Sequence, residues 1–126
     1  MGAITMAAEI PQLGQFSVSL KVKDLKASRS FYEVLGFNVF EFKNGPPPGF
    51  GEKWIILQNG SATIGLFQGG VEKNTLTFNP PDVRAVQKGL KERGAKLVVE
   101  ADEKSNGPAF CLLTDPDGNP VLLDQH

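Results

Sequence analysis

With 126 residues, the chain has the length of one domain and can bury a single hydrophobic core. Its formal charge is −1, from 13 basic and 14 acidic side chains, and it has no basic run, so nucleic acid is not expected as a partner. No segment reaches the roughly 20 apolar residues that cross a bilayer, so a membrane partner is not expected either.

Residues 1–14 precede the first predicted strand, and the sequence leaves open whether they form a flexible arm, an edge strand or a remnant of expression. They carry no Lys or Arg, and Glu9 interrupts their apolar stretch, so no secretory signal is expected. The single cysteine, Cys111, has no partner for an intramolecular disulfide and lies in an apolar run, where a buried, inert thiol is expected. Both features predict a cytoplasmic protein.

The rest of the chain contains a repeat with an offset of 58 residues (82 − 24 = 58), which aligns Asp24 with Asp82. Each aspartate suits the N-cap of a helix, where its carboxylate accepts hydrogen bonds from free amides. At the same offset Gly36 aligns with Gly94, and each glycine suits the left-handed position that ends a helix. We therefore expect two copies of one module.

In chain order, each copy reads as a strand with alternating apolar and polar residues, a helix of about three turns, and three more strands. The predicted strands are 16–22, 37–42, 54–58 and 63–67 in the first copy, and 75–79, 95–99, 110–114 and 121–124 in the second. The predicted fold class is α+β. The domain, 15–126, has one βαβββ module at about 15–72 and another at about 73–126, and the two form a cupped mixed β-sheet.

Each predicted helix has one apolar stripe to bury, so the helices are expected to cover the apolar faces of the strands. The polar strand residues then line the cup: Ser17, Ser19, Lys21, Thr75, Thr77 and Asn79. The alternative is that this face is simply solvated, as on many half-buried sheets. Among these side chains Lys21 is the best candidate for a general base or for binding an anionic substrate, and a solvated or ion-paired lysine is the alternative.

The connector 43–53 is the longest stretch rich in proline and glycine. Three aromatic residues lie around it: Phe42, Phe50 and Trp54. They either form walls for a planar ligand or fill the edge of the core as part of a surface loop.

Two segments, "SVSLKVKDLKASRSFYEVLGF" and "DPDGNPVLLDQ", resemble the vicinal oxygen chelate superfamily, which includes glyoxalase I, bleomycin-resistance proteins and extradiol dioxygenases. The resemblance covers nearly the whole chain after residue 14. It implies paired βαβββ modules, a ligand cleft within the cupped sheet and frequent homodimers. In the enzymes it also implies a divalent metal held by one residue from each of four strands.

The four metal-ligand positions that the resemblance implies carry unsuitable residues here. Two of them fall on Ser17 and Thr75, and a third falls on Leu122. The fourth falls on Ile64, or on Gly65 if that strand has the family's more usual register. Because metals are held by imidazole, thiolate or carboxylate groups, we expect neither a metal nor another cofactor. His126, the only histidine, is expected to be a solvated tail.

The sequence therefore predicts a glyoxalase/bleomycin-resistance-like protein that lacks the usual metal ligands and binds a small organic molecule, favouring a binding protein over an enzyme. The predicted pocket residues are Ser17, Ser19, Lys21, Trp54, Ile64, Thr75, Thr77, Asn79 and Leu122. One alternative is a metal-dependent lyase or dioxygenase of the glyoxalase type with an atypical site. A protein-interaction module is the other.

Overall fold

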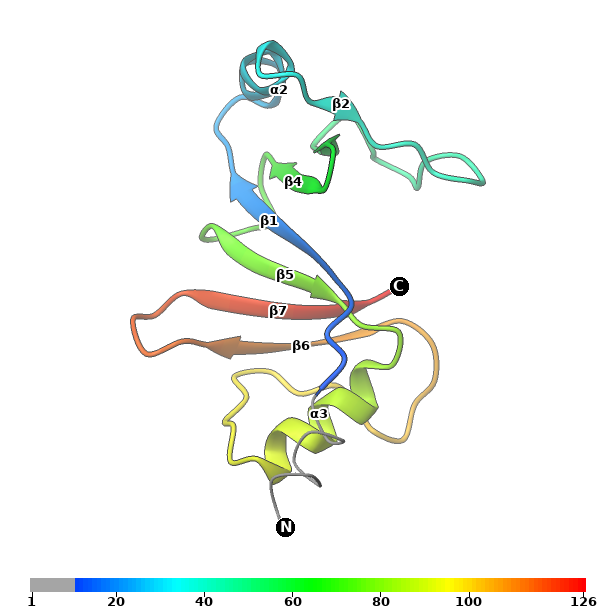
Figure 1. Ribbon diagram of the computed structural model, residues 1–126, viewed down its shortest axis with the longest axis vertical. Coiled ribbons are helices and arrows are strands. Elements are labelled where there is room, and N and C mark those ends of the chain that lie inside the picture. Colours follow the sequence, from blue (N-terminus) through cyan, green and yellow to red (C-terminus); the bar gives the residue numbers. More distant parts are fainter. Residues whose placement is uncertain (1–10) are drawn as a thin grey trace. The chain divides into compact units, whose positions relative to one another are not determined.

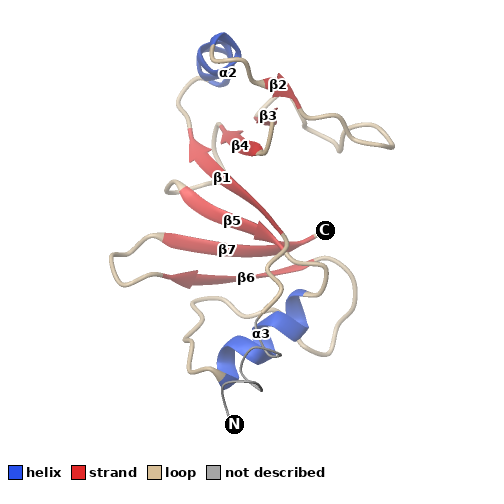
Figure 2. Ribbon diagram, viewed as in Figure 1, coloured by secondary structure: helices blue, strands red, loops and turns tan. Residues whose placement is uncertain are grey.

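The computed structural model describes residues 11–126, which form two compact units. The N-terminal unit comprises Ser17–Leu76, and the C-terminal unit comprises Thr77–His126 together with residues 11–16. Strands β1 (Gln15–Lys21) and β5 (Thr75–Asn79) each contribute residues to both units. Within the described residues each unit combines strands with one helix, and Figure 1 and Figure 2 show these elements. The predicted α+β fold class is confirmed.

The sheet of the N-terminal unit has the strand order β2-β3-β4-β1. Its other strands are β2 (Asn38–Val39), β3 (Trp54–Asn59) and β4 (Ala62–Phe67). β3 is antiparallel to both β2 and β4, whereas β1 is parallel to β4. The sheet is therefore mixed, as predicted. Helix α2 (Leu25–Val34) connects β1 to β2.

The C-terminal unit has the strand order β5-β7-β6, with β6 at Ala109–Thr114 and β7 at Pro120–Gln125. β6 and β7 pair antiparallel along their whole length. Helix α3 (Val83–Glu92) lies beside these strands in Figure 1. Each unit thus places one helix against one side of its strands.

Both predicted N-caps are confirmed. The carboxylate of Asp24 accepts a hydrogen bond from the amide of Ala27 (3.2 Å), and Asp82 accepts one from Ala85 (3.1 Å). These bonds satisfy amides that have no partner within the helix. Each helix is ten residues long. Within residues 11–126, no helix is long and apolar enough to cross a membrane.

The helix ends are also as predicted, because Gly36 and Gly94 both have positive φ angles, of 100° and 91°. A side chain is strained in this left-handed region, so glycine suits the position after the last helical turn. Asn59, at the end of β3, adds a second contact here: its Nδ2 donates to the backbone oxygen of Gly36 (3.1 Å). The end of α2 is therefore fixed to the sheet.

Each unit has its own apolar core. The buried core of the N-terminal unit consists of Leu25, Ile55, Leu57 and Leu66. That of the C-terminal unit consists of Val83, Val86, Ala101, Cys111 and Leu123. Burial raises the pKa of Cys111 to about 11, so its reactive thiolate is scarce at neutral pH.

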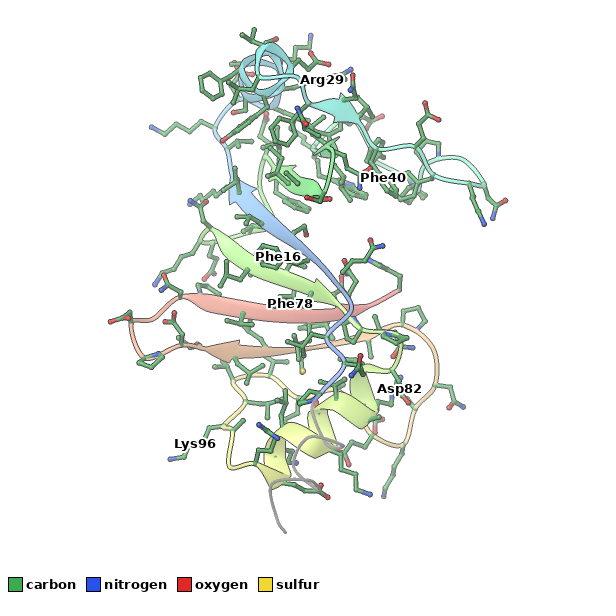
Figure 3. The ribbon with its side chains drawn as sticks, in the orientation of Figure 1. Phe16, Arg29, Phe40, Phe78, Asp82 and Lys96 are labelled. Atoms are coloured by element: carbon green, nitrogen blue, oxygen red, sulfur yellow. The ribbon has the colours of Figure 1, made fainter. Side chains whose placement is uncertain are left out.

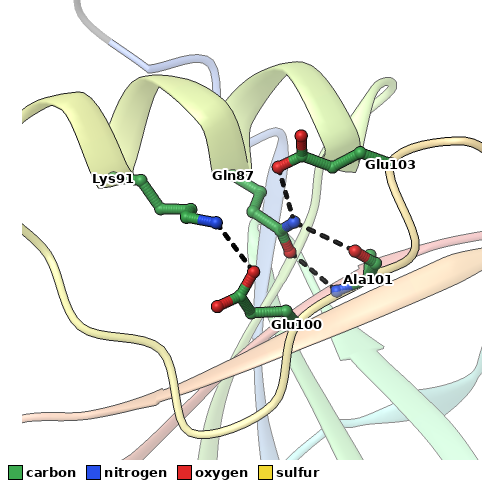
Figure 4. Close-up of polar contacts among 5 residues, drawn as sticks. All are labelled: Gln87, Lys91, Glu100, Ala101 and Glu103. Carbon is green, nitrogen blue, oxygen red and sulfur yellow. Dashed lines mark hydrogen bonds and ion pairs between the residues drawn. The ribbon is translucent and has the colours of Figure 1, made fainter.

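A buried glutamine ties α3 to the segment that follows it (Figure 4). Gln87 is 0% exposed, and its amide oxygen accepts from Ala101 N (2.7 Å) while its Nε2 donates to Ala101 O (3.0 Å). The same Nε2 donates to a carboxylate oxygen of Glu103 (3.0 Å). Nearer the surface, Lys91 forms an ion pair with Glu100 (2.8 Å). The side chain of Gln87 thus satisfies both backbone hydrogen-bonding groups of Ala101, as a neighbouring strand would.

Arg84 holds the next residues of this segment. Its guanidinium donates to the backbone oxygens of Asp102 (2.9 Å) and Gly107 (2.9 Å), and to the hydroxyl of Ser105 (2.8 Å). We call residues 100–107 the clamped segment. The charged composition of this segment suggests a free loop, but α3 binds it at several points.

Two predicted strands are shorter than expected. The strand predicted at 37–42 is reduced to β2, and the one predicted at 95–99 is a single bridge between Val99 and Leu112. In the second case the amides of Val98 and Val99 both donate to the same oxygen, that of Leu112, which a regular ladder does not allow. Because Gln87 then takes both backbone groups of Ala101, the ladder does not continue.

Candidate ligand-binding site

The strands of the N-terminal unit have one face that packs on the core with α2 and one that points away from it. Ile55, Leu57 and Leu66 belong to the core. Side chains alternate along a strand, and paired residues on adjacent strands share a face. The registers therefore define the opposite side, here called the helix-free face. Its residues are Ser17, Ser19, Lys21, Asn38, Trp54, Ile56, Gln58, Thr63, Gly65 and Phe67.

The register of β4 decides between Ile64 and Gly65, the two residues that the sequence left open for the fourth implied metal-ligand position. Gly65 pairs with Ser19 of β1, so it lies on the helix-free face. Ile64 pairs with Val18 and packs against the core of the N-terminal unit. Of the residues predicted to line a pocket, Ile64 therefore points to the other side of the sheet, because a shift of one residue reverses the face.

Two aromatic rings lie parallel on the helix-free face. The ring centroids of Trp54 and Phe67 are 5.9 Å apart, and their planes differ by 2°. The two residues are cross-strand partners on β3 and β4, and both are partly exposed. Together the rings offer parallel surfaces on which a planar molecule can stack. Phe67 was not among the predicted site residues, although the alternation that selects Gly65 also selects Phe67.

The absence of a side chain at Gly65 leaves room for the ring of Phe67. A Cβ atom at Gly65 would lie 2.7 Å from Cε1 of Phe67, closer than real contacts allow. Gly65 itself is buried. The ring therefore occupies the space that any other side chain would fill, and a larger residue at 65 would displace it.

Further rings continue from Trp54 toward the connector. Phe50 meets Trp54 edge to face (5.0 Å), Phe42 meets Phe50 (5.0 Å), and Phe40, labelled in Figure 3, meets Phe42 (4.8 Å). Phe50 also packs against the core of the N-terminal unit. The connector therefore fills the edge of the core, one of its two predicted roles. The same contacts support Trp54 from one side.

The other end of the helix-free face is polar. Gln58 Nε2 donates to Thr63 Oγ1 across the two strands (3.2 Å). Ser19 is 7% exposed and Ser17 is partly buried. Thr75 instead lies near the Lys21 end, because the side chain of Asn74 accepts from the amide of Lys21; Thr75 is 9% exposed, and its hydroxyl donates to the backbone oxygen of Lys73 (2.8 Å).

Lys21 lies on the same face and is exposed. Its backbone amide donates to Oδ1 of Asn74 (2.9 Å), which fixes the end of β1. Within residues 11–126 its ammonium group has no ion pair, since the two ion pairs there join other residues. This exposed cation is the paired neighbour of Phe67 in the register of β1 and β4.

The remaining predicted site residues belong to the C-terminal unit. Phe78 packs against the core of that unit, so its neighbours Thr77 and Asn79 point the other way. Leu123 is buried in the same core, and Leu122 therefore also points away from it. Figure 3 labels Phe78.

Two residues on this face of the C-terminal unit were not predicted as site residues. Asp124 follows Leu122 by two positions, so alternation places it on the same face. Asn79 Nδ2 donates to the backbone oxygen of Asp124 (2.9 Å) and lies 3.1 Å from Nε2 of His126. His126 is exposed. Burial raises the pKa of Asp124, and the nearby His126 opposes part of that rise.

Replacing Asp124 with asparagine is expected to stabilise the protein modestly at neutral pH. The raised pKa means that ionisation of Asp124 is less favourable in the folded than in the unfolded chain. Below the pKa values of Asp124 in both the folded and the unfolded chain, the group is protonated and stability is not reduced. As the pH rises through these two values stability falls, and above both of them the loss is complete. Urea denaturation at about pH 7 and about pH 3 tests this sign. Asp117→Asn, at an exposed position, is the control, and a wild type more stable than Asp124→Asn at neutral pH would contradict it.

The residues at the four implied metal-ligand positions do not fit a metal. Ser17 and Thr75 offer hydroxyls, while Leu122 and Gly65 offer no donor atom in their side chains. Transition metals prefer imidazole, thiolate and carboxylate ligands, and hard cations need several oxygens, carboxylates among them. In the described part of the chain, no group of three or more His, Cys, Asp or Glu residues is placed to hold a metal ion.

The sequence profile of the Glyoxalase/Bleomycin resistance protein/Dioxygenase superfamily matches residues 13–123. No curated protein matches the chain significantly. Several solved structures share the fold. Methylmalonyl-CoA epimerase from Mycobacterium tuberculosis is 18% identical with a TM-score of 0.66, over 92% of this chain and 90% of that one. A superfamily member from Vibrio splendidus 12B01 is 18% identical with a TM-score of 0.59, over 88% and 97%.

A dioxygenase shows the same fold within a longer chain. Homoprotocatechuate 2,3-dioxygenase from Brevibacterium fuscum is 24% identical with a TM-score of 0.57, over 92% of this chain and 37% of that one. At these identities the similarity shows the fold and not the activity.

Proposed function

Since the chain belongs to the Glyoxalase/Bleomycin resistance protein/Dioxygenase superfamily, we propose that it is a metal-independent protein that binds a small planar organic molecule. The ligand stacks on the helix-free face of the N-terminal unit. Trp54 supplies the main surface, and the hydroxyls of Ser17 and Ser19 lie on the same face. In this proposal Thr75, which belongs to the same unit, adds a further hydroxyl.

The observation that carries the proposal is the pair of parallel rings. An aromatic side chain that only fills a core is usually enclosed, whereas Trp54 and Phe67 lie on the side of the sheet opposite the core. Their planes are parallel to within 2°, and a buried glycine leaves room for one of them. Within residues 11–126 the indole N–H of Trp54 has no acceptor and is not enclosed, so it is available to a ligand.

The donor groups support metal independence. The proposed site offers hydroxyls, an amide and aromatic rings, which suit an organic molecule better than a cation. The second candidate is an enzyme of the glyoxalase type with an atypical site, which is favoured by the half-buried Asp124 beside His126. Elemental analysis of untreated protein separates the two: a stoichiometric divalent metal would support the enzyme and contradict the binding protein.

We propose further that the protein is a cytoplasmic homodimer. The superfamily resemblance implies frequent homodimers, and β2 lies at the end of its strand order, where one side has no partner strand within residues 11–126. Sedimentation equilibrium gives the oligomeric state directly, and a monomer at all concentrations tested would contradict this part.

The binding proposal is tested with isotope-labelled protein and a panel of planar aromatic compounds. Trp54 is the only tryptophan, so a single indole N–H resonance reports on the site. We expect that resonance to shift on titration. Trp54→Ala, followed by calorimetry, is expected to weaken binding by about tenfold or more, as for other buried aromatic contacts. Trp54→Phe keeps a ring and is expected to retain most of the affinity.

Two further variants locate the site. Gly65→Ala is expected to displace the ring of Phe67 and to weaken binding, since its Cβ would collide with that ring. Phe31→Ala removes an aromatic ring of α2 that is 61% exposed and is not on the helix-free face, so it is expected to leave binding unchanged. If no planar compound moves the indole resonance, or if Phe31→Ala weakens binding as much as Trp54→Ala, the proposal is wrong.

A further inference from the structure

We propose that the planar ligand carries a negative charge, and that Lys21 is the residue that selects it. This inference rests on the proposed function and narrows its ligand to planar anions, such as an aromatic carboxylate. It depends on where Lys21 lies, on which charges surround it, and on what its ammonium group already contacts.

The position of Lys21 follows from the strand register. Lys21 of β1 pairs with Phe67 of β4, and Phe67 pairs with Trp54 of β3. Three adjacent strands therefore carry the lysine and the two parallel rings in one row across the sheet. Neighbouring strands are about 4.8 Å apart, and a lysine side chain is long and flexible enough to reach the edge of a molecule stacked on those rings.

The charges of the helix-free face favour an anion. Among its ten residues Lys21 is the only charged one, and none is acidic. A negatively charged group on the ligand would therefore meet a cation and no fixed anion of this face. A positively charged ligand would be repelled, so the charge pattern discriminates between ligands of similar shape.

Among residues 11–126, no ion pair competes for the ammonium group of Lys21. Arg29 pairs with Glu33, and Lys91 pairs with Glu100, in the only two ion pairs of the described residues. The backbone amide of Lys21 donates to Oδ1 of Asn74. The residue is thus held in place through its main chain while its side chain is left for a ligand. An exposed pairing of this kind changes affinity only modestly, by about fivefold.

Two probes of the same shape test the inference: 2-naphthoate, which is an anion at neutral pH, and 2-naphthamide, which is neutral. Their affinities are measured from the indole resonance of Trp54. The wild type is expected to bind 2-naphthoate about fivefold more tightly than 2-naphthamide at low salt. This preference is expected to shrink as salt is added, because ions screen an exposed charge pair.

Substitutions assign the preference to Lys21. Lys21→Met is expected to equalise the two affinities by weakening 2-naphthoate alone, whereas Lys21→Arg is expected to keep the preference. Lys26→Met is the matched control, since it removes the same charge from an exposed residue of α2 in the same unit. It is expected to change neither affinity.

The outcomes distinguish the anion preference of Lys21 from the proposed binding of planar ligands. If both probes bind equally to the wild type, or if Lys21→Met leaves the preference intact, the inference is overturned while the binding site stands. If neither probe nor any other planar compound shifts the indole resonance, both fail. A loss of 2-naphthoate binding with unchanged binding of 2-naphthamide in Lys21→Met would support both.

Discussion

Replacing Gln87 with alanine is expected to lower the free energy of unfolding by about 3 to 5 kcal/mol. Gln87 is 0% exposed, and its amide bonds both backbone groups of Ala101, which is 8% exposed. Alanine would leave the N–H and C=O of Ala101 buried without partners, at about 1 to 3 kcal/mol each. Urea denaturation of wild type and variant measures the difference.

The neighbouring ion pair provides the control. Lys91 lies on the same helix and binds the same clamped segment, but its contact with Glu100 is exposed to solvent. Lys91→Ala is therefore expected to change stability little, because exposed ion pairs contribute little in water. Equal losses in Gln87→Ala and Lys91→Ala would contradict the importance of burial. Gln87→Glu is also expected to be destabilising at neutral pH, since a carboxylate cannot donate to Ala101 and would face Glu103.

The second large effect is expected for Leu57→Ala, at about 2 to 5 kcal/mol. Leu57 is 0% exposed and lies in the core of the N-terminal unit with Leu25 and Leu66. Alanine removes apolar contacts and leaves a cavity that the neighbouring strands can only partly fill. Thermal or urea denaturation measures the loss.

An exposed leucine of the same unit is the matched control. Leu35, the C-cap of α2, is 56% exposed, so Leu35→Ala removes the same atoms without leaving a comparable cavity. A change within about 0.5 kcal/mol is expected. If Leu35→Ala were as costly as Leu57→Ala, the core assignment would be wrong.

The helix-free face also bears on how this scaffold accommodates different functions. The positions that the superfamily resemblance assigns to metal ligands hold Ser17, Thr75, Gly65 and Leu122 here. A glycine at one of them does more than omit a ligand, because it makes room for the ring of Phe67. A metal-binding side chain at position 65 would occupy the space that the ring of Phe67 fills here.

Local features of this protein were predictable from the sequence because they depend on atoms only a few residues apart. Asp24 and Asp82 bond amides three residues ahead, and Gly36 and Gly94 take backbone angles that other residues avoid. The repeat then indicated the α+β class and the order of elements. Alternation within β1 likewise identified Ser17, Ser19 and Lys21 as one face.

Only the tertiary structure decided how the strands align and which residues meet across them. The choice between Ile64 and Gly65 depends on the pairing of β4 with β1, and a shift of one residue would reverse it. The parallel rings of Trp54 and Phe67 depend on a second pairing, that of β3 with β4. The bonds between Gln87 and Ala101, 14 residues apart, also depend on tertiary packing, and they stop the strand pairing from continuing beyond Val99. Sequence periodicity determines which residues of one strand lie on the same face. Contacts between strands depend on their register, which is fixed only when the core packs.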